Sequence, residues 1–124
     1  MPDQTDVPIV RRWEDVPSTP LADGLEMRLL GGASVSVGLA HAEAGAVVAP
    51  HSHPQEQFTY VLSGRMQFTL GLDDEQRTVG PEEIVQIPGG ATHSVEVLEA
   101  SVYFEVFAPR RDELHAMPVS ASSG

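Results

Sequence analysis

Two histidines separated by a single residue carry the clearest chemistry in this sequence. They are His51 and His53, and each has a proline on its outer side in the segment Pro50-His51-Ser52-His53-Pro54. On extended backbone, residues two apart project to the same side, so the two imidazoles lie together. Adjacent imidazoles are costly to desolvate unless they bind something, and neutral imidazole is a good ligand for zinc, nickel, copper or iron. The pair therefore predicts a metal site.

A third histidine offers a further ligand from a distant part of the chain. His93 follows the turn sequence Pro88-Gly89-Gly90 and starts a run with strand character. The two remaining histidines, His41 and His115, receive no role: the first lies on the strand before the histidine pair, and the second lies in an irregular C-terminal region.

The elements that must position these side chains are short strands. Ten prolines and 11 glycines divide the chain, and several runs between them alternate apolar and polar residues, as half-buried strands do. The strands are predicted at residues 33–40, 57–62, 66–70, 83–87, 94–98 and 101–107. We expect a tight turn at Ser63-Gly64, a hairpin loop over 71–75 and a helical turn within 110–117.

This pattern favours an all-β sandwich or barrel made of antiparallel strands. A length of 124 residues suits a single domain. We expect the barrel to span about 13–114, with Trp13 packing in an N-terminal strand, and the ends 1–8 and 118–124 to be flexible.

The last predicted strand separates two kinds of side chain. Tyr103, Glu105 and Phe107 share one face, and aliphatic or aromatic residues occupy the other. If the second face packs outward, Glu105 enters a cavity, where desolvation would raise its pKa. The alternative is that Glu105 lies on a solvated face of an edge strand.

The charge balance excludes several classes of function. Eighteen acidic residues stand against seven basic ones, all arginine, for a net charge of −11, and the chain has no cysteine. Lysine Schiff bases, thiolate ligands and disulfides are therefore excluded. An acidic surface also disfavours nucleic acids and anionic membranes. With no apolar run of membrane-spanning length, we expect a cytoplasmic protein whose partner is a small molecule.

Two spaced motifs resemble those of the cupin superfamily. The first is carried by Gly45, His51, His53, Gln57 and Gly64, and the second by Glu82, Pro88, Gly90, His93 and Val97. The resemblance implies a jelly-roll barrel around one divalent metal ion, and often a homodimer. Gln57 stands where the general motif has an acidic ligand. Glu56 is the alternative, but strand alternation turns it to the opposite face.

Within the cupins, residues from about 13 to 114 resemble the KdgF family of pectin degradation proteins. The points of resemblance are Trp13-Glu14-Asp15-Val16-Pro17, His51-Ser52-His53-Pro54 and Glu105-Val106-Phe107-Ala108-Pro109-Arg110-Arg111. The resemblance implies metal ligation by His51, His53, His93 and Gln57, and a cavity acid, aromatic and arginine at Glu105, Phe107 and Arg111. It also implies conversion of an unsaturated uronate to an open-chain keto form. The family typically has aspartate where this chain has Glu105.

These residue types suit such chemistry. Arg111 could bind a carboxylate as a bidentate fork, and Glu105 could carry a proton beside Tyr103 and Phe107. Arg110 is the alternative to Arg111 at the cavity. The ion could be nickel, zinc, iron or manganese. Other hypotheses are a metal-dependent dioxygenase, a polyketide cyclase, a non-catalytic cupin that binds a small ligand, a site of three histidines with Gln57 only nearby, and a barrel that has lost its metal.

Overall fold

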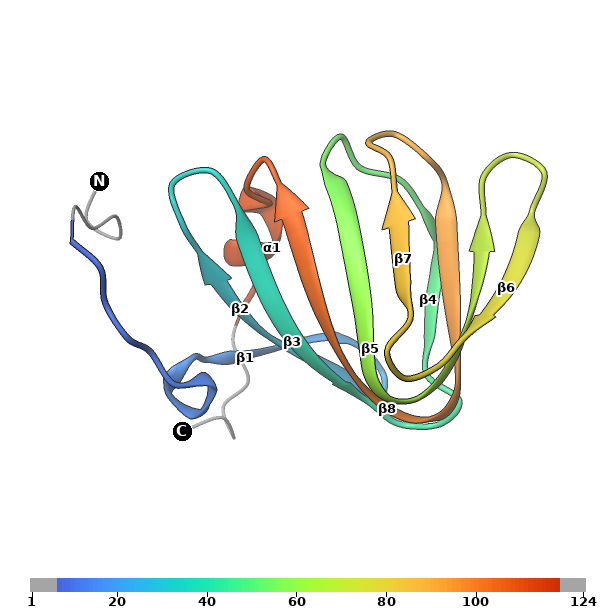
Figure 1. Ribbon diagram of the computed structural model, residues 1–124, viewed down its shortest axis with the longest axis horizontal. Coiled ribbons are helices and arrows are strands. Elements are labelled where there is room, and N and C mark those ends of the chain that lie inside the picture. The colour runs from blue at the N-terminus through green and yellow to red at the C-terminus, as the bar shows by residue number, and fades with distance from the viewer. Residues whose placement is uncertain (1–6, 119–124) are drawn as a thin grey trace.

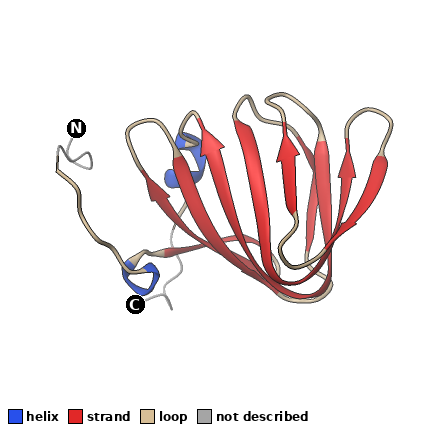
Figure 2. Ribbon diagram, in the orientation of Figure 1, coloured by secondary structure: helices blue, strands red, loops and turns tan. Residues whose placement is uncertain are grey.

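The computed structural model describes residues 7–118, and strands dominate this range (Figure 2). The elements are η1 (Trp13–Asp15), β1 (Ser18–Ala22), β2 (Leu25–Gly31), β3 (Ser36–Ala42), β4 (Val47–His51), β5 (Glu56–Leu70), β6 (Glu75–Val79), β7 (Ile84–Ile87), β8 (His93–Ala108) and α1 (Asp112–His115). All strand pairings are antiparallel. The predicted all-β class and jelly-roll fold are confirmed.

Two long bent strands, β5 and β8, organise the sheet. The first half of β5 pairs with the second half of β8, and beyond the bend the second half of β5 pairs with the first half of β8. On one side of the bend β8 also pairs with β3, and on the other side with β4. Figure 1 shows the result, a sheet folded over on itself with the bends at the bottom of the view.

The bend corrects one sequence expectation. Ser63-Gly64 is not a hairpin turn, because β5 runs through it and both halves of β5 stay paired with β8. Gly64 has a φ of 93°, and a Cβ there would come within 2.2 Å of Ser101 Oγ. Glycine is needed because the two strands approach closely where they bend. For the same reason residues 94–98 and 101–107 form one strand rather than two.

Of the other expectations for the secondary structure, some are confirmed and some are wrong. The hairpin loop over 71–75 joins β5 to β6, and the predicted helical turn is α1. Four strands were missed, β1, β2, β4 and β6, because prolines and charges obscure their alternation. Trp13 lies in η1 rather than in a strand. Of the ends expected to be flexible, 1–6 and 119–124 lie outside the described residues.

The barrel is open along one side. The continuous strand order is β1-β2-β3-β8-β5-β6, and no pairing within residues 7–118 joins β1 to β6. Its interior is filled by a cluster of buried apolar side chains that includes Met27, Val61, Met66, Phe68 and Val97. Within the same range, no helix has the length and apolar character needed to cross a membrane.

Candidate metal centre and cavity

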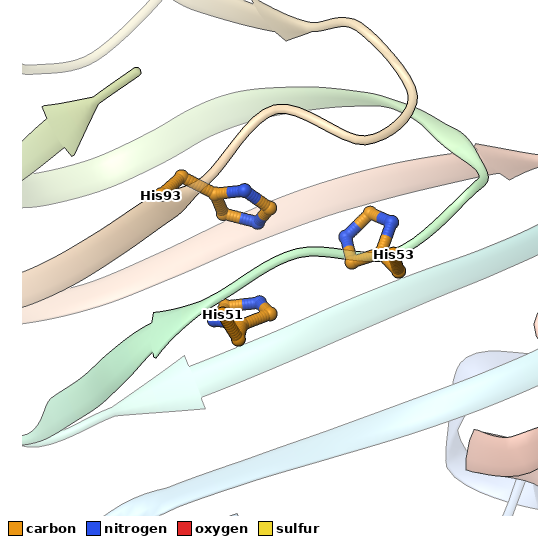
Figure 3. Close-up of side chains that lie close together, drawn as sticks. All are labelled: His51, His53 and His93. Carbon is orange, nitrogen blue, oxygen red and sulfur yellow. The ribbon is translucent and has the colours of Figure 1, made fainter. Parts of the chain in front are cut away.

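The three predicted ligand histidines meet at the open end of the barrel, opposite the bends. β4 ends at His51 and β8 begins at His93, and these two residues are direct partners in the sheet. His53 follows two residues after β4 on the segment that leads into β5. Figure 3 shows the three rings turned toward one another from these two parts of the chain.

The rings lie close enough to share one ion. The ring centroid of His93 is 4.2 Å from that of His51 and 5.0 Å from that of His53, and the His51 and His53 centroids are 5.7 Å apart. One nitrogen from each ring lies within 4.8 Å of the other two. His53 and His93 are buried and His51 is half-buried, so a bound ion would be largely shielded from water.

Each imidazole is fixed by a carbonyl two residues away in its own segment. The contacts are His51 Nδ1 to Ala49 O at 2.8 Å, His53 Nδ1 to Gln55 O at 3.1 Å, and His93 Nδ1 to Ala91 O at 2.9 Å. A carbonyl oxygen only accepts hydrogen bonds, so each Nδ1 carries the proton. In a neutral ring the other nitrogen, Nε2, then holds a lone pair, which is the form that binds metals.

Gln57 adds an oxygen to the three nitrogens. Its Nε2 donates to Glu105 Oε2 at 2.8 Å and to Thr59 Oγ1 at 2.9 Å, which turns its Oε1 to within 3.0 Å of His53 Nε2. Both atoms of this last contact are acceptors when His53 is neutral, so no hydrogen bond joins them. Two facing lone pairs at this distance repel unless a cation lies beside both. Glu56, the alternative ligand, is exposed.

Their surroundings favour the neutral forms of His53 and His93. Burial lowers the pKa of His93 to about 4, and burial followed by the nearby Arg111 charge lowers the pKa of His53. His93 Nε2 is buried with no hydrogen-bond partner, which is costly for a polar atom without a ligand. Three neutral imidazole nitrogens and one amide oxygen fit a divalent transition metal ion.

A cavity of about 330 Å³ opens beside this cluster. Its polar side chains are His51, Gln57, His93, Glu105 and Arg111. The rest of the lining is apolar or aromatic and comprises Leu21, Leu25, Met27, Val48, Ala49, Pro50, Met66, Val95, Tyr103, Phe107, Leu114 and Met117. The polar groups therefore gather around one part of an otherwise apolar chamber, as in many small-molecule sites.

Glu105 points into this cavity and not to solvent. Its Oε2 accepts hydrogen bonds from Gln57 Nε2 and, at 2.7 Å, from Thr59 Oγ1. Burial raises the pKa of Glu105 to about 7, although the Thr59 bond, the Arg111 charge and the Gln57 bond act against it. Burial, and then the Glu105 charge, also raise the pKa of the Tyr103 phenol. Within residues 7–118 both hydrogen bonds to Glu105 end on Oε2, which leaves Oε1 available to a ligand.

Arg111, and not Arg110, is the arginine at the cavity. Its guanidinium carbon lies 4.9 Å from the centre of the Phe107 ring, and its Nε donates to Glu113 Oε2 at 2.6 Å. Arg110 instead donates to Asp112 Oδ1 at 2.8 Å and does not line the cavity. The alternation within the last strand is as expected, because Glu105 and Phe107 are buried and line the cavity.

Two residues without a predicted role hold Arg111 in place. The hydroxyl oxygen of Ser36 accepts a hydrogen bond from the Arg111 backbone N–H at 2.9 Å and contacts His115 Nε2 at 2.8 Å. Ser36 is fully buried. Because 79 residues separate Ser36 from His115, nothing in the sequence signals this contact. His115 lies in α1, within the predicted helical turn, while His41 lies exposed on β3.

The chain is similar in sequence or in fold to several known proteins. An uncharacterized protein of Streptomyces coelicolor is 30% identical over 88 residues, which cover 70% of this chain and 82% of that protein. KdgF from a Halomonas species superposes with a TM-score of 0.71 at 25% identity, over 77% of this chain and 88% of the other. The polyketide cyclase RemF from Streptomyces resistomycificus superposes with a TM-score of 0.70 at 26% identity, over 83% of this chain and 80% of the other.

The model of the cupin domain family matches residues 38–107, which is more than half of the chain. This range begins in β3 and ends in β8, so it contains all three histidines and Gln57. Fold, motif spacing and similarity therefore agree, and the chain belongs to the cupin domain family.

Proposed function

We propose that this chain is a metal-dependent enzyme acting on a small organic anion, with one divalent ion held by His51, His53, His93 and Gln57. The observation that carries the proposal is the convergence of three unprotonated ring nitrogens and one amide oxygen. The hydrogen bonds of the other atoms of these groups fix that orientation. When bound, the ion supplies Lewis acidity toward an oxygen of the ligand, and the neutral ligand set leaves its charge uncompensated.

The protein's own residues bind and orient the anion. Since the Nε of Arg111 is taken by Glu113, a carboxylate would be held by its two Nη groups. The guanidinium lies over the Phe107 ring, and this contact restricts its movement. The apolar walls, including Leu114 and Met117, exclude water around the bound molecule.

Glu105 is the group that moves a proton. In the ring opening of an unsaturated uronate, the anomeric hydroxyl loses a proton as the ring C–O bond breaks. The enol carbon then gains a proton as the ketone forms. A carboxyl group at one side of the cavity, with Oε2 fixed by Thr59 and Gln57 and Oε1 available, can take up the first proton and deliver the second. The likeness to KdgF supports unsaturated uronates as the substrate.

The test combines metal analysis with an assay. The purified chain should contain about one equivalent of nickel, zinc, iron or manganese and should consume an unsaturated uronate, followed by the loss of its ultraviolet absorbance. The His93→Ala variant should lose both metal and activity, whereas His41→Ala, a matched change at an exposed histidine, should keep both. Metal-free wild-type protein would contradict the proposal, and iron with consumption of dioxygen would support a dioxygenase instead.

The apolar lining of the cavity favours a second candidate, the cyclisation of a polyketide-like anion. Apart from the metal cluster, Glu105, Arg111 and the Tyr103 hydroxyl, no lining side chain can pair with a hydroxyl group, and unpaired buried hydroxyls are costly. The likeness to RemF supports this candidate. Turnover of an aromatic polyketide acid, with no turnover of the uronate by the same metal-loaded protein, would favour it over ring opening.

A further inference from the structure

The buried face of β8 presents three side chains to the cavity at different depths. Tyr103, Glu105 and Phe107 alternate with less buried residues, and all three line the cavity. Tyr103 comes two residues after Ser101, where β5 and β8 bend, and Phe107 lies toward the open end. Residues two apart on a strand are separated by about 7 Å. Tyr103 is therefore the deepest of the three side chains.

The hydroxyl group of Tyr103 has no partner in the fold. The residue is only 4% exposed, and its sheet partners Ala40 and Val61 are apolar and fully buried. Within residues 7–118 no hydrogen bond involves the hydroxyl. A buried tyrosine usually pairs this group, because a buried polar atom without a partner is costly. Phenylalanine would fill the same space without that cost, so the hydroxyl calls for a ligand.

The chemistry around the hydroxyl favours one kind of ligand atom. Burial, followed by the Glu105 charge, raises the pKa of the Tyr103 phenol well above its ordinary value, so the group keeps its proton and can donate it. The same Glu105 charge disfavours a further anion at this position. The matching atom is therefore a neutral oxygen, as in a hydroxyl or carbonyl group.

The other end of the series has a different preference. Among the described residues that line the cavity, Arg111 is the only arginine, and its guanidinium lies over the Phe107 ring. Apolar side chains of Leu25, Met27 and Met66 contribute to the walls. A molecule with a carboxylate at one end and a neutral oxygen at the other would pair both polar ends of the cavity.

We propose that Tyr103 determines specificity, by donating a hydrogen bond to a neutral oxygen at the end of the ligand opposite its carboxylate. The inference rests on the proposed function for the carboxylate site at Arg111. It narrows the substrate class to hydroxy or keto acids whose second oxygen is remote from the carboxylate. An acid that ends in a hydrocarbon leaves the hydroxyl unpaired and binds more weakly.

Two unreactive acids of the size of a sugar ring isolate the contribution of this oxygen. Cyclohexanecarboxylate lacks it, and the trans derivative with a hydroxyl group on the opposite ring carbon carries it. In isothermal titration of the purified full chain, the wild type should bind the hydroxy acid about threefold to tenfold more tightly, as one net hydrogen bond allows. Tyr103→Phe should bind both acids with the affinity that the wild type has for the plain acid.

The second tyrosine of the chain supplies a matched control. Tyr60 lies on the outward face of β5 and does not line the cavity, so Tyr60→Phe removes the same atom elsewhere and should leave both affinities unchanged. Arg111→Gln should weaken both acids and keep their ratio. The melting temperature of Tyr103→Phe should stay constant or rise, because the lost hydroxyl has no partner in the fold.

The proposal is overturned if the wild type binds the two acids alike or binds neither. It is also overturned if Tyr103→Phe keeps the preference for the hydroxy acid, or if this variant melts several degrees lower, as loss of a structural hydrogen bond would cause. If the preference depends on Tyr103 but the uronate is not consumed, the assignment of Tyr103 stands and ring opening is excluded. Consumption of the uronate without any preference excludes the assignment alone.

Discussion

The cavity and the packed interior are built from the same two strands, β5 and β8, but with different buried side chains. Beside the cavity, the buried, inward residues include the polar Gln57, Thr59 and Glu105 as well as the aromatic Phe107. Farther along the same two strands the buried residues are apolar, such as Phe68 and Val97. The alternation is identical in both regions, so periodicity determines which residues are buried. The chemical character of the buried side chains then decides whether a region can act as a site or only as a core.

The largest expected effect is on catalysis at the open end. Glu105→Gln keeps the size of the side chain and removes its ability to carry a proton, so kcat should fall by two to four orders of magnitude, roughly the contribution of a general acid or base. Metal content should stay near that of wild type, and the free energy of unfolding should not fall, because glutamine removes a buried carboxyl that is costly to ionise. Unchanged turnover would remove Glu105 from the reaction.

The corresponding change in the interior should act on stability instead. Phe68 is fully buried and does not line the cavity. Phe68→Ala should lower the free energy of unfolding by about 3–5 kcal/mol, as large-to-small changes in a packed core do. Denaturant titration measures this. If kcat of the remaining folded protein fell as far as in Glu105→Gln, the two regions would not be separable.

Lowering the pH should destabilise the metal-free protein, because protonation of His93 is unfavourable in the fold. The pKa of His93 is about 4 in the fold, against an ordinary value of 6.5, so between these values the folded state binds fewer protons than the unfolded chain. His93 therefore contributes at most about 3 kcal/mol to the free energy of unfolding. This contribution is complete above pH 6.5 and is lost as the pH falls toward 4.

Glu105 changes the free energy of unfolding in the opposite direction. Its pKa is raised from 4.5 to about 7, so the fold gains stability from this group as the pH falls. The pH titration is therefore cleanest in the metal-free Glu105→Gln variant, followed by thermal unfolding from pH 7 to pH 4. A melting temperature that does not fall with acidification in that variant would contradict the assignment of His93 as a buried neutral group.

The smallest expected effect concerns the support of Arg111. Ser36→Ala removes the acceptor of the Arg111 backbone N–H and the contact with His115, at a cost of about 1 kcal/mol for each lost bond. The KM for an anionic substrate should rise several-fold while kcat changes little, and Ser36→Thr should restore part of the loss. A fall in kcat at constant KM would place Ser36 in another role.

The sequence predicted the fold class and the division of the last strand into two faces, because both depend on local alternation. It left open which of the two faces is inward, and the structure answers this with the buried Glu105 and Phe107. His51, His53 and His93 were recognisable because their spacing and turn signals are local too. The single strands formed by β5 and β8 were not predictable, since a glycine in a strand interior resembles a turn until its partner strand is known. Ser36 and His115 were missed because their contact depends entirely on how the C-terminal helix lies against β3.

The carbonyl partners of the three histidines have one more consequence. Each ring is aimed by a peptide group within its own stretch of three residues, so its direction depends little on side chains elsewhere in the barrel. Sequence drift in the walls could then reshape the chamber, and with it the choice of molecule, while the ion stays where it is. The same local arrangement makes the donor geometry portable: grafted onto equivalent strand ends of another barrel, these short stretches should aim their rings in the same way.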